Sequence, residues 1–566
     1  MKKIQKLAVL LGLAPIVVFS SCSNDFLDRK PTTALESSVV LNDPDMVPST
    51  VVGSMSMFSG YGFMGRNGVI GGELMTDVAT TMGKSGHLQD LEKWNIHSNM
   101  DELADFWSYC YAVSASATQT SHFCNKLLKD TTKLTSTQIT SLQNAIACSK
   151  VIRAYCDFYL LQNFCVDYQL TSSLVPGDHK DRKVGVVLIG DEPLGISEPA
   201  NMGTLDACYA SIEKTLEEAI TYFEESKTIG YTPASESRYF PTLCAAYVMQ
   251  ARVFLAKGGE DNLDKALQAV DAAFDNLPTG TSANLISNYE TLYEGYKSAA
   301  ATSEDIWTIN YTSQDNLSAN SLQNFFSSYN CAISTNITNK FKSTDFRKNL
   351  YPSKPGKESR CLKYPNSTGV FNVPVMRVPE LYLIRAEVAA ARGKKDDMID
   401  ALFEVLKARD NSVHERADIE GGSYNYGTLE EDAKVLIPIV LDERVKEYAG
   451  EGYRWSDLRR NARYGVRLNR PGLSEDPSYL LHFGNYNLAR FALPVPFDET
   501  STAQWQNGHG IFDNGETDRN NPNWQNNAWE KQNGALYAPS DDDLIPNEGD
   551  GLDADGKVVP ETPATW

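Results

Sequence analysis

The chain has 566 residues, a formal net charge of −21 and a hydrophobic fraction of 42%. Its length and apolar content are sufficient for a large buried core. Its negative charge argues against nucleic acid, or an anionic lipid surface, as a partner held by bulk electrostatics.

The N-terminus has the pattern of an export signal. Three lysines precede an uncharged apolar run over residues 7–19, which is shorter than the roughly 20 residues that a membrane-spanning helix needs. A basic start, a short apolar run and small residues are typical of a cleaved secretory signal. Because two serines stand directly before Cys22, we expect a lipoprotein signal over residues 1–21 and acylation of Cys22, for example with palmitate. An ordinary signal peptide with an incidental cysteine is the alternative.

Beyond this segment, the dominant hydrophobic period is helical. Apolar residues spaced three and four apart predict helices over residues 205–223, 263–274 and 398–408. Two further helix pairs are expected, one joining 103–128 to 139–164 and the other joining 429–449 to 453–461. Strand-like runs are short, and they cover residues 184–189, 306–311, 370–378 and 491–495.

An internal repeat relates residues 247–273 to residues 382–408, which align without gaps. Each copy has the pattern of a helix, a turn glycine and a second helix, with Gly258 and Gly393 at equivalent positions. The alanines of the second helix follow the spacing of a tetratricopeptide unit. Such a helix pair cannot bury its apolar face alone, so it needs stacked neighbours. We therefore predict a mainly α fold with a tetratricopeptide-like helix-pair scaffold over about 100–275 and 377–461.

Three long stretches interrupt this scaffold, at about 30–100, 275–376 and 465–566. They are rich in Asn, Ser, Gly, Pro and aromatic residues. Excursions of this size in a compact protein are usually functional. The expected architecture is a helical scaffold that carries large loop-rich excursions and a few short strands.

Six motifs in order along the chain resemble those of a known family. They are CSNDFLDRKPTT (22–33), KVIRAYCDFYLLQNFCVDY (150–168), AAYVMQARVFLA (245–256), RVPELYLIRAEVAAARG (377–393), ERVKEYAGEGYRWSDLRR (443–460), and LPVPFDE (493–499) with NPNWQN (521–526). Together they resemble the SusD/RagB family, the surface lipoproteins of Bacteroidota nutrient-uptake systems. The resemblance implies an ectodomain over residues 22–566, anchored by lipid to the cell outer membrane and facing the extracellular side.

The resemblance also implies a function. Members of the family bind oligosaccharides, or in some cases peptides, and each lies as a lid over a TonB-dependent transporter of the SusC type. No catalysis is associated with the family. We therefore expect glycan binding and delivery to a SusC-like partner, without a cofactor and without nucleic acid. Peptide or glycopeptide capture is the first alternative, and a secreted lipoprotein hydrolase is an alternative from another class.

The sequence offers little support for an enzyme or a metal centre. The carboxylates Glu443, Glu447, Glu451 and Asp457 are interleaved with basic residues, which favours an ion-pair network over the two flanking carboxylates of a glycosidase. The seven histidines show no HxH or HxxxH spacing, and no CxxC or zinc-type cluster occurs. The nine cysteines after Cys22 lie beside apolar residues and are expected to be buried free thiols.

Aromatic side chains are the remaining candidates for ligand binding, because flat rings stack on the C–H faces of sugars. Trp107, Trp307 and Trp455 are assigned to the core. Exposure is expected instead for Tyr289, Tyr293, Tyr296, Tyr311, Phe325, Phe326 and Tyr329, and the Gly-rich aromatic loop FSGYGFMGRNG (58–68) is a further candidate. In the family, loops from the early and middle regions hold ligands. The predicted ligand-binding residues are Trp94, Asn95, Asp77, Tyr293 and Tyr311.

Overall fold

The computed structural model describes residues 37–81, 87–93, 96–165, 167–169, 184–194, 202–226, 237–329, 331–352, 360–365, 369–420, 429–464, 466–468, 481–482 and 492–496. Helices dominate these residues, and the predicted mainly α fold is confirmed. None of the described helices is both long enough and apolar enough to cross a membrane.

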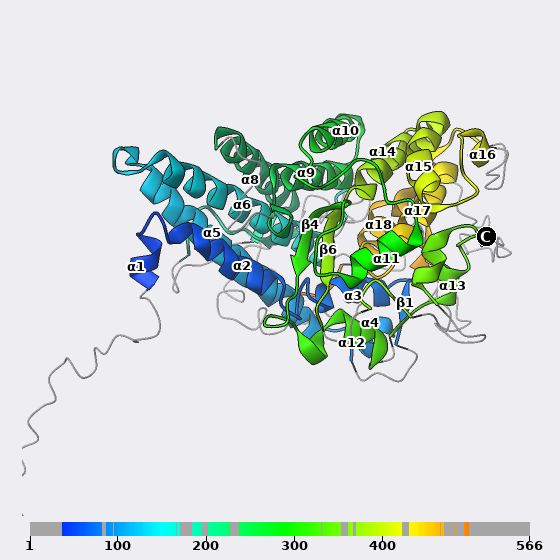
Figure 1. Cartoon of the computed structure of the whole chain (residues 1–566), viewed down its shortest axis with the longest axis horizontal. Coiled ribbons are helices and arrows are strands. Elements are labelled where there is room, and N and C mark those ends of the chain that lie inside the picture. Colours follow the sequence, from blue (N-terminus) through cyan, green and yellow to red (C-terminus); the bar gives the residue numbers. More distant parts are fainter. Residues whose placement is uncertain are drawn as a thin grey trace, which may run out of the picture.

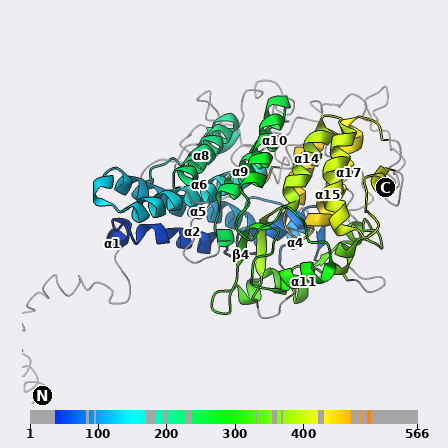
Figure 2. The same ribbon diagram turned by 45° about the horizontal axis from the view of Figure 1, so that its top comes forward.

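The scaffold is a series of helices that follow one another across the molecule (Figure 2). They are α5 (Asp101–Leu128), α6 (Ser136–Phe164), α8 (Leu205–Glu225), α9 (Leu243–Lys257), α10 (Glu260–Asp275), α14 (Pro379–Ala391), α15 (Lys395–Arg409), α17 (Ala433–Tyr448) and α18 (Arg454–Arg460). Consecutive helices pack as pairs, α5 with α6, α9 with α10 and α14 with α15, while α10 also contacts α14. The predicted helix pairs are therefore present.

Local sequence explains where the scaffold helices begin. Thr135 and Gln138 form a capping box at α6, in which each side chain accepts a hydrogen bond from the other residue's backbone N–H. Thr204 and Thr242 cap α8 and α9 by accepting from the backbone N–H three residues on. The buried face of each helix then follows the predicted apolar stripe.

The repeat's two glycines end their helices in a backbone conformation that disfavours a side chain. Gly258 has φ +61° and Gly393 has φ +67°, a region that glycine enters without steric cost. A Cβ on Gly393 would lie 2.8 Å from the backbone oxygen of Glu431. The glycine thus permits both the turn and the close approach of the segment before α17.

Shorter helices precede the scaffold or interrupt it. They are α1 (Ser37–Leu41), α2 (Thr50–Phe58), α3 (Asn67–Leu74), α4 (Gln89–Glu92), α11 (Tyr289–Lys297), α12 (Leu322–Ser327), α13 (Thr335–Thr338) and α16 (Ala417–Glu420). Helix α2 packs along α5, and α3 contacts both α5 and α18. In Figure 1, α3, α4 and α12 gather on the side of the molecule opposite to α9 and α10.

The strands form two-stranded antiparallel pairs. The longest pair joins β4 (Asp305–Asn310) to β6 (Asn372–Arg377), with Ile309 opposite Val373. The others are β1 (Ala79–Thr80) with β5 (Ala332–Ile333), β2 (Val184–Val187) with β3 (Met202–Thr204), and β7 (Arg467–Leu468) with β8 (Leu481–His482). The strand-like runs at 184–189, 306–311 and 370–378 match β2, β4 and β6. Residues 492–496 carry no strand, unlike the prediction for 491–495.

One apolar core runs through the scaffold and the excursions. Trp107, Trp307 and Trp455 are buried, as predicted. The nine cysteines after Cys22 are all free and buried, which also agrees with the prediction. Small residues of the repeat, such as Ala266 and Ala401, are buried, which permits the helices to pack closely.

The expected exposure of several aromatic residues in the middle excursion is wrong. Tyr296, Phe325 and Phe326 are buried, because segments distant in sequence cover them. The Tyr296 hydroxyl donates to Glu451 Oε1 at 3.4 Å, and the Phe326 ring stacks on Tyr364 at 6.1 Å. An alternation of polar and aromatic residues indicates a face, but it does not show what packs on that face.

Candidate functional site

Glu447 stands at the centre of a buried ion-pair network. Its carboxylate accepts from Arg347, Arg377 and Arg409 at 3.0, 2.7 and 3.0 Å. Burial opposes ionisation of this group, but the three guanidinium groups outweigh burial and hold the pKa of Glu447 well below its usual range. These arginines come from outside the 443–460 motif, so the network joins α15, α17, β6 and the middle excursion.

A second part of the network lies within the motif and braces α17 against α18. Asp457 accepts from Arg444 and Arg460 at 2.8 Å each, and Arg460 also donates to Glu387 of α14 at 2.7 Å. Burial would raise the pKa of Asp457, yet Arg444 and Arg460 lower it. A glycosidase needs a carboxylic acid with a raised pKa, so Asp457 is shifted in the opposite direction. The predicted structural ion-pair network is what the motif forms.

Glu73 has a raised pKa, but its carboxylate is bound to the backbone and has a structural role. It is fully buried, and burial raises its pKa to about 7. Its two carboxylate oxygens accept from the backbone N–H groups of Gly450 and Gly452 at 3.1 and 2.7 Å. A perturbed carboxyl group can indicate catalysis, but this one fixes α3 to the turn between α17 and α18.

Two predicted ligand residues have their polar atoms engaged by the protein. Both carboxylate oxygens of Asp77 accept from Arg454, at 2.8 and 2.9 Å. Tyr311 is 3% exposed, so the expectation that it is exposed is wrong. Its hydroxyl donates to the backbone oxygen of Ser59 at 2.5 Å. Both side chains hold the early segment of the chain against distant segments.

The Gly-rich loop at residues 59–66 presents Tyr61 at the surface. Tyr61 is 37% exposed, and its ring meets the edge of Tyr109 at a centroid distance of 6.2 Å. Gly60 and Gly62 leave room for the Tyr109 ring, because a Cβ on Gly60 would lie 2.6 Å from Tyr109 Cε1. The two glycines therefore let Tyr109 of α5 support the loop from below.

Arg66 connects this loop to the middle excursion. Its guanidinium lies 5.3 Å from the centroid of the Tyr61 ring and 5.8 Å from that of Phe325. Its Nε donates to Asn67 Oδ1 at 2.9 Å, and its Nη1 donates to Oδ1 of the exposed Asn320 at 3.3 Å. Arg66 Nη2 has no hydrogen-bond partner among the described residues. A buried cation and an exposed amide thus lie beside an exposed aromatic ring.

Tyr329 extends the same surface toward the segment after residue 86. Its ring lies 6.2 Å from Phe325 and 4.5 Å from the exposed imidazole of His87. The pairing of β1 with β5 brings these early and middle segments together. We call the surface formed by Tyr61, Arg66, Tyr109, Asn320 and Tyr329 the aromatic junction.

The remaining predicted residues lie elsewhere or outside the described residues. Tyr293 is half-buried on α11, where its ring stacks on Tyr289 at 5.5 Å with an interplanar angle of 11°. Trp94 and Asn95 fall outside the described residues, directly after Lys93. Cys22 also lies outside them. The structure therefore does not test the ligand role of these residues, and it stays a prediction.

The sequence pointed to the loop of the aromatic junction but not to the contact of that loop with Asn320. Residues 58–68 stand out for their glycines and aromatic rings, whereas nothing in the sequence pairs Arg66 with Asn320, 254 positions later. Tyr109 lies two residues from the buried Trp107 on the same helix, and only the tertiary structure shows that its ring is half-buried and packs under Tyr61.

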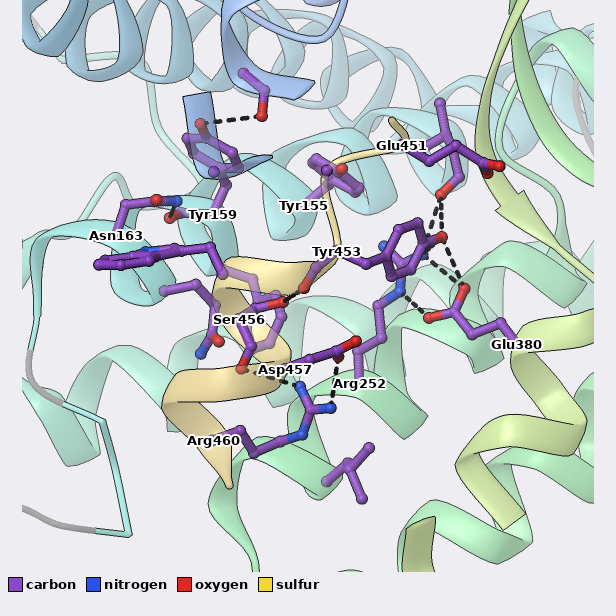
Figure 3. Close-up of a pocket in the computed structure, with 18 of the residues that line it drawn as sticks. Tyr155, Tyr159, Asn163, Arg252, Glu380, Glu451, Tyr453, Ser456, Asp457 and Arg460 are labelled. Atoms are coloured by element: carbon purple, nitrogen blue, oxygen red, sulfur yellow. Dashed lines mark hydrogen bonds and ion pairs between the residues drawn. The ribbon is translucent and has the colours of Figure 1, made fainter. Parts of the chain in front are cut away.

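A separate pocket opens between the scaffold helices and α3 (Figure 3). We call it the scaffold pocket, and its cavity volume is about 100 Å³. Its aromatic lining consists of Tyr155, Phe158, Tyr159, Tyr453 and Trp455.

Charged residues complete the lining of the scaffold pocket as ion pairs. Figure 3 shows Arg252, Glu380 and Tyr453 hydrogen-bonded to one another on one wall, with Arg252 Nε 2.6 Å from Glu380 Oε1. Arg460 and Asp457 form another ion pair in the lining, at 2.8 Å. Within the described residues, no group of three or more His, Cys, Asp or Glu side chains is placed to hold a metal ion.

Comparison with known proteins shows which solved structures share this fold. Residues 307–542 match the model of the SusD family. No curated protein matches the chain in sequence. A SusD superfamily protein from Bacteroides vulgatus ATCC 8482 is 23% identical with a TM-score of 0.63, covering 81% of this chain and 96% of that chain.

Two further solved structures carry descriptions of binding. A putative sugar binding protein from the same organism is 20% identical with a TM-score of 0.64, covering 81% of this chain and 96% of its own. Surface glycan-binding protein A from Bacteroides thetaiotaomicron, solved with laminarihexaose, is 14% identical with a TM-score of 0.57, covering 81% and 98%. Residues 307–542 of this chain thus match the SusD family model, and the fold is that of solved SusD superfamily structures.

Proposed function

We propose that this protein binds oligosaccharides or polysaccharides at the cell surface and delivers them to a TonB-dependent outer-membrane transporter of the SusC type. The observation that carries the binding role is the aromatic junction, where the exposed ring of Tyr61 lies beside Arg66 and Asn320. The match of residues 307–542 to the SusD family model and the likeness to a structure solved with laminarihexaose support the same ligand class.

The chemistry of the junction suits a sugar ring. Pyranose rings present apolar C–H faces that stack on flat aromatic rings, while their hydroxyls need donors and acceptors. Arg66 lies over the Tyr61 ring, and a sugar would stack on the exposed part of that ring. Asn320 has both a donor and an acceptor in its amide, and Arg66 Nη2 offers a charged donor. Because Tyr109 packs against the Tyr61 ring, the Tyr61 side chain loses little conformational freedom when a ligand binds.

The predicted ligand residues enter this proposal in two ways. We propose direct contacts for Trp94 and Asn95, which follow the same early segment, and for Tyr293, whose stacked partner Tyr289 makes a flat aromatic surface. For Asp77 and Tyr311 we propose a supporting role, because their polar atoms bond to Arg454 and Ser59.

The proposed location of the protein rests on acylation of Cys22. We propose that it is the acylated N-terminus of a lipoprotein that faces the extracellular side of the outer membrane. Acyl chains stabilise membrane attachment by about 0.8 kcal/mol per buried CH2. The anchor would hold the ectodomain beside its transporter, so that binding and delivery take place at one point of the membrane.

Affinity gels cast with a panel of polysaccharides, followed by titration calorimetry, test the binding role. The expected result is retardation by at least one glycan. Tyr61→Ala should weaken binding roughly tenfold, since an aromatic contact contributes about 1.5 kcal/mol. Tyr247→Ala is the matched control, because this tyrosine is half-buried on α9, outside the aromatic junction. Unchanged affinity in Tyr61→Ala would place the ligand elsewhere, and Trp94→Ala then tests the neighbouring segment.

The same preparation separates the alternatives. Release of shorter sugars from any glycan of the panel would contradict a binding-only role and favour a hydrolase. Retardation by no polysaccharide, together with heat of binding for peptides, would favour peptide capture. Co-purification with a SusC-like transporter from the native membrane tests the proposed partner.

A further inference from the structure

The charge of Arg66, in the aromatic junction, is poorly compensated by the protein. The Arg66 side chain is 5% exposed. Among the described residues, the hydrogen bonds of its guanidinium group both go to neutral amides, those of Asn67 and Asn320. A buried charge is costly unless an opposite charge lies beside it. The protein therefore bears this cost at the surface where the ligand is proposed to bind.

Other buried arginines of this protein have carboxylate partners. Carboxylates within ion-pair distance compensate Arg347, Arg377, Arg409, Arg444, Arg454 and Arg460. Arg459 instead donates to the backbone oxygens of Gln162 and Cys165 within the core. Arg66 differs from all of these, because it combines neutral partners with a position at a candidate ligand surface.

Two acidic residues of α5 compensate this charge only from a distance. Burial lowers the pKa of Arg66, and Asp105 and Glu102 are among the neighbours that raise it. Asp105 accepts from Asn67 Nδ2 at 3.2 Å, so a neutral amide stands between its carboxylate and Arg66. A guanidinium group stays protonated in proteins. The junction therefore keeps a full positive charge.

The polar groups left for a ligand beside Arg66 are donors. Asn320 Oδ1 already accepts from Arg66 Nη1 at 3.3 Å, which leaves the two Nδ2 hydrogens of this exposed side chain for a ligand. Arg66 Nη2 has no acceptor in the part of the chain that the structure describes. Two donors, one of them charged, need an acceptor. A carboxylate only accepts, and it forms strong charge-assisted hydrogen bonds with a guanidinium group.

We propose that the aromatic junction selects glycans that contain uronic acids. The sugar ring stacks on the exposed part of Tyr61, and its carboxylate accepts from Arg66 Nη2 and Asn320 Nδ2. This inference rests on the proposed glycan binding at the junction and adds the charge of the ligand to it. The net charge of −21 repels a polyanion at long range, so selection comes from these short-range contacts and not from bulk electrostatics.

Titration calorimetry with polygalacturonate, alginate and hyaluronate tests the proposal on the wild-type protein. Each polymer is compared with its own form after reduction of the carboxyl groups to alcohols, which keeps the linkages and removes the charge. We expect at least one uronate polymer to bind, and its reduced form to bind about tenfold more weakly or worse, as for a lost charged hydrogen bond. Equal affinity for both forms, equal affinity for dextran sulfate, or binding of neutral polysaccharides alone would overturn the inference and leave glycan binding intact. Binding of no polysaccharide would overturn the proposed function as well.

Asn320→Asp locates the carboxylate site, because it places a carboxylate beside Arg66 within the protein itself. The side chain keeps its shape and is exposed, so the fold should be unaffected, which circular dichroism checks. Affinity for the uronate polymer should fall about tenfold or more. Asn411→Asp is the matched control, since Asn411 is exposed after α15 and receives the same charge. Its affinity should equal that of wild type. Wild-type affinity in Asn320→Asp, or an equal loss in Asn411→Asp, would show that the ligand carboxylate does not lie beside Arg66.

Discussion

Replacing Glu447 with glutamine removes a buried negative charge that Arg347, Arg377 and Arg409 share. Each carboxylate oxygen accepts from two of these arginines, at distances between 2.7 and 3.1 Å. Glutamine keeps one acceptor, but its NH2 group faces guanidinium donors. Three positive charges then lose a common partner at the centre of the core.

The expected loss of stability is large. Removing one partner of a buried ion pair costs about 3–5 kcal/mol, because the remaining charge stays buried without compensation. Glu447 serves three partners and is 2% exposed, so we expect a loss of about 4 kcal/mol. Glu404→Gln is the matched control, because Glu404 pairs with Lys407 on the surface of α15. Its loss should stay within about 0.5 kcal/mol.

Urea unfolding followed by circular dichroism measures both variants at pH 7. The difference between them should persist in 1 M salt, where the Debye length of about 3 Å screens exposed pairs but not buried ones. The folded-state pKa of Glu447 is lowered, so its contribution is present above pH 4.5 and lost as the pH falls through the folded pKa. Glu447→Gln should therefore lose less stability on acidification than wild type. A loss below 1 kcal/mol at pH 7, or one equal to that of the control, would refute this account.

Four further substitutions have defined outcomes. Burial raises the pKa of Asp157 to about 6, so its contribution is full below about pH 3.8 and is lost as the pH rises through 6. Asp157→Asn should gain up to about 3 kcal/mol on wild type between pH 4 and pH 8, and a constant difference in unfolding free energy would contradict this. Gly393→Ala should destabilise by about 2 kcal/mol or more, since φ is +67°. Gly53→Ala, in open space within α2, should instead stabilise by about 0.5–1 kcal/mol, and equal melting temperatures would contradict the contrast. Cys22→Ala should move the protein from the detergent phase to the aqueous phase after Triton X-114 partitioning, and retention in the detergent phase would contradict lipid anchoring.

Helices were predictable because their signal is local. The stripe over 205–223 corresponds to α8, and the repeat at 247–273 and 382–408 corresponds to two helix pairs with a turn glycine in each. A period of 3.6 residues depends only on neighbours in the chain, and each helix then buries the face that the period marks.

Side-chain environments were less predictable because they depend on distant segments. Glu447 is bound by arginines 38, 70 and 100 positions away, and no local pattern indicates that pairing. Tyr311 follows β4, which is buried along most of its length, and the distant loop at Ser59 covers Tyr311 as well. For the same reason, the sequence identified the Gly-rich loop of the aromatic junction but not the residues from distant segments that complete it. Its polar groups come together through a contact across 254 positions.

The bonds that tie α3 to the turn after α17 also constrain when this protein can fold. Glu73 and Asp77 reach partners 377 positions later in the chain. Such high contact order makes folding slow, and these contacts cannot form until more than 450 residues have emerged. A variant truncated before α18 should therefore not reach the native state.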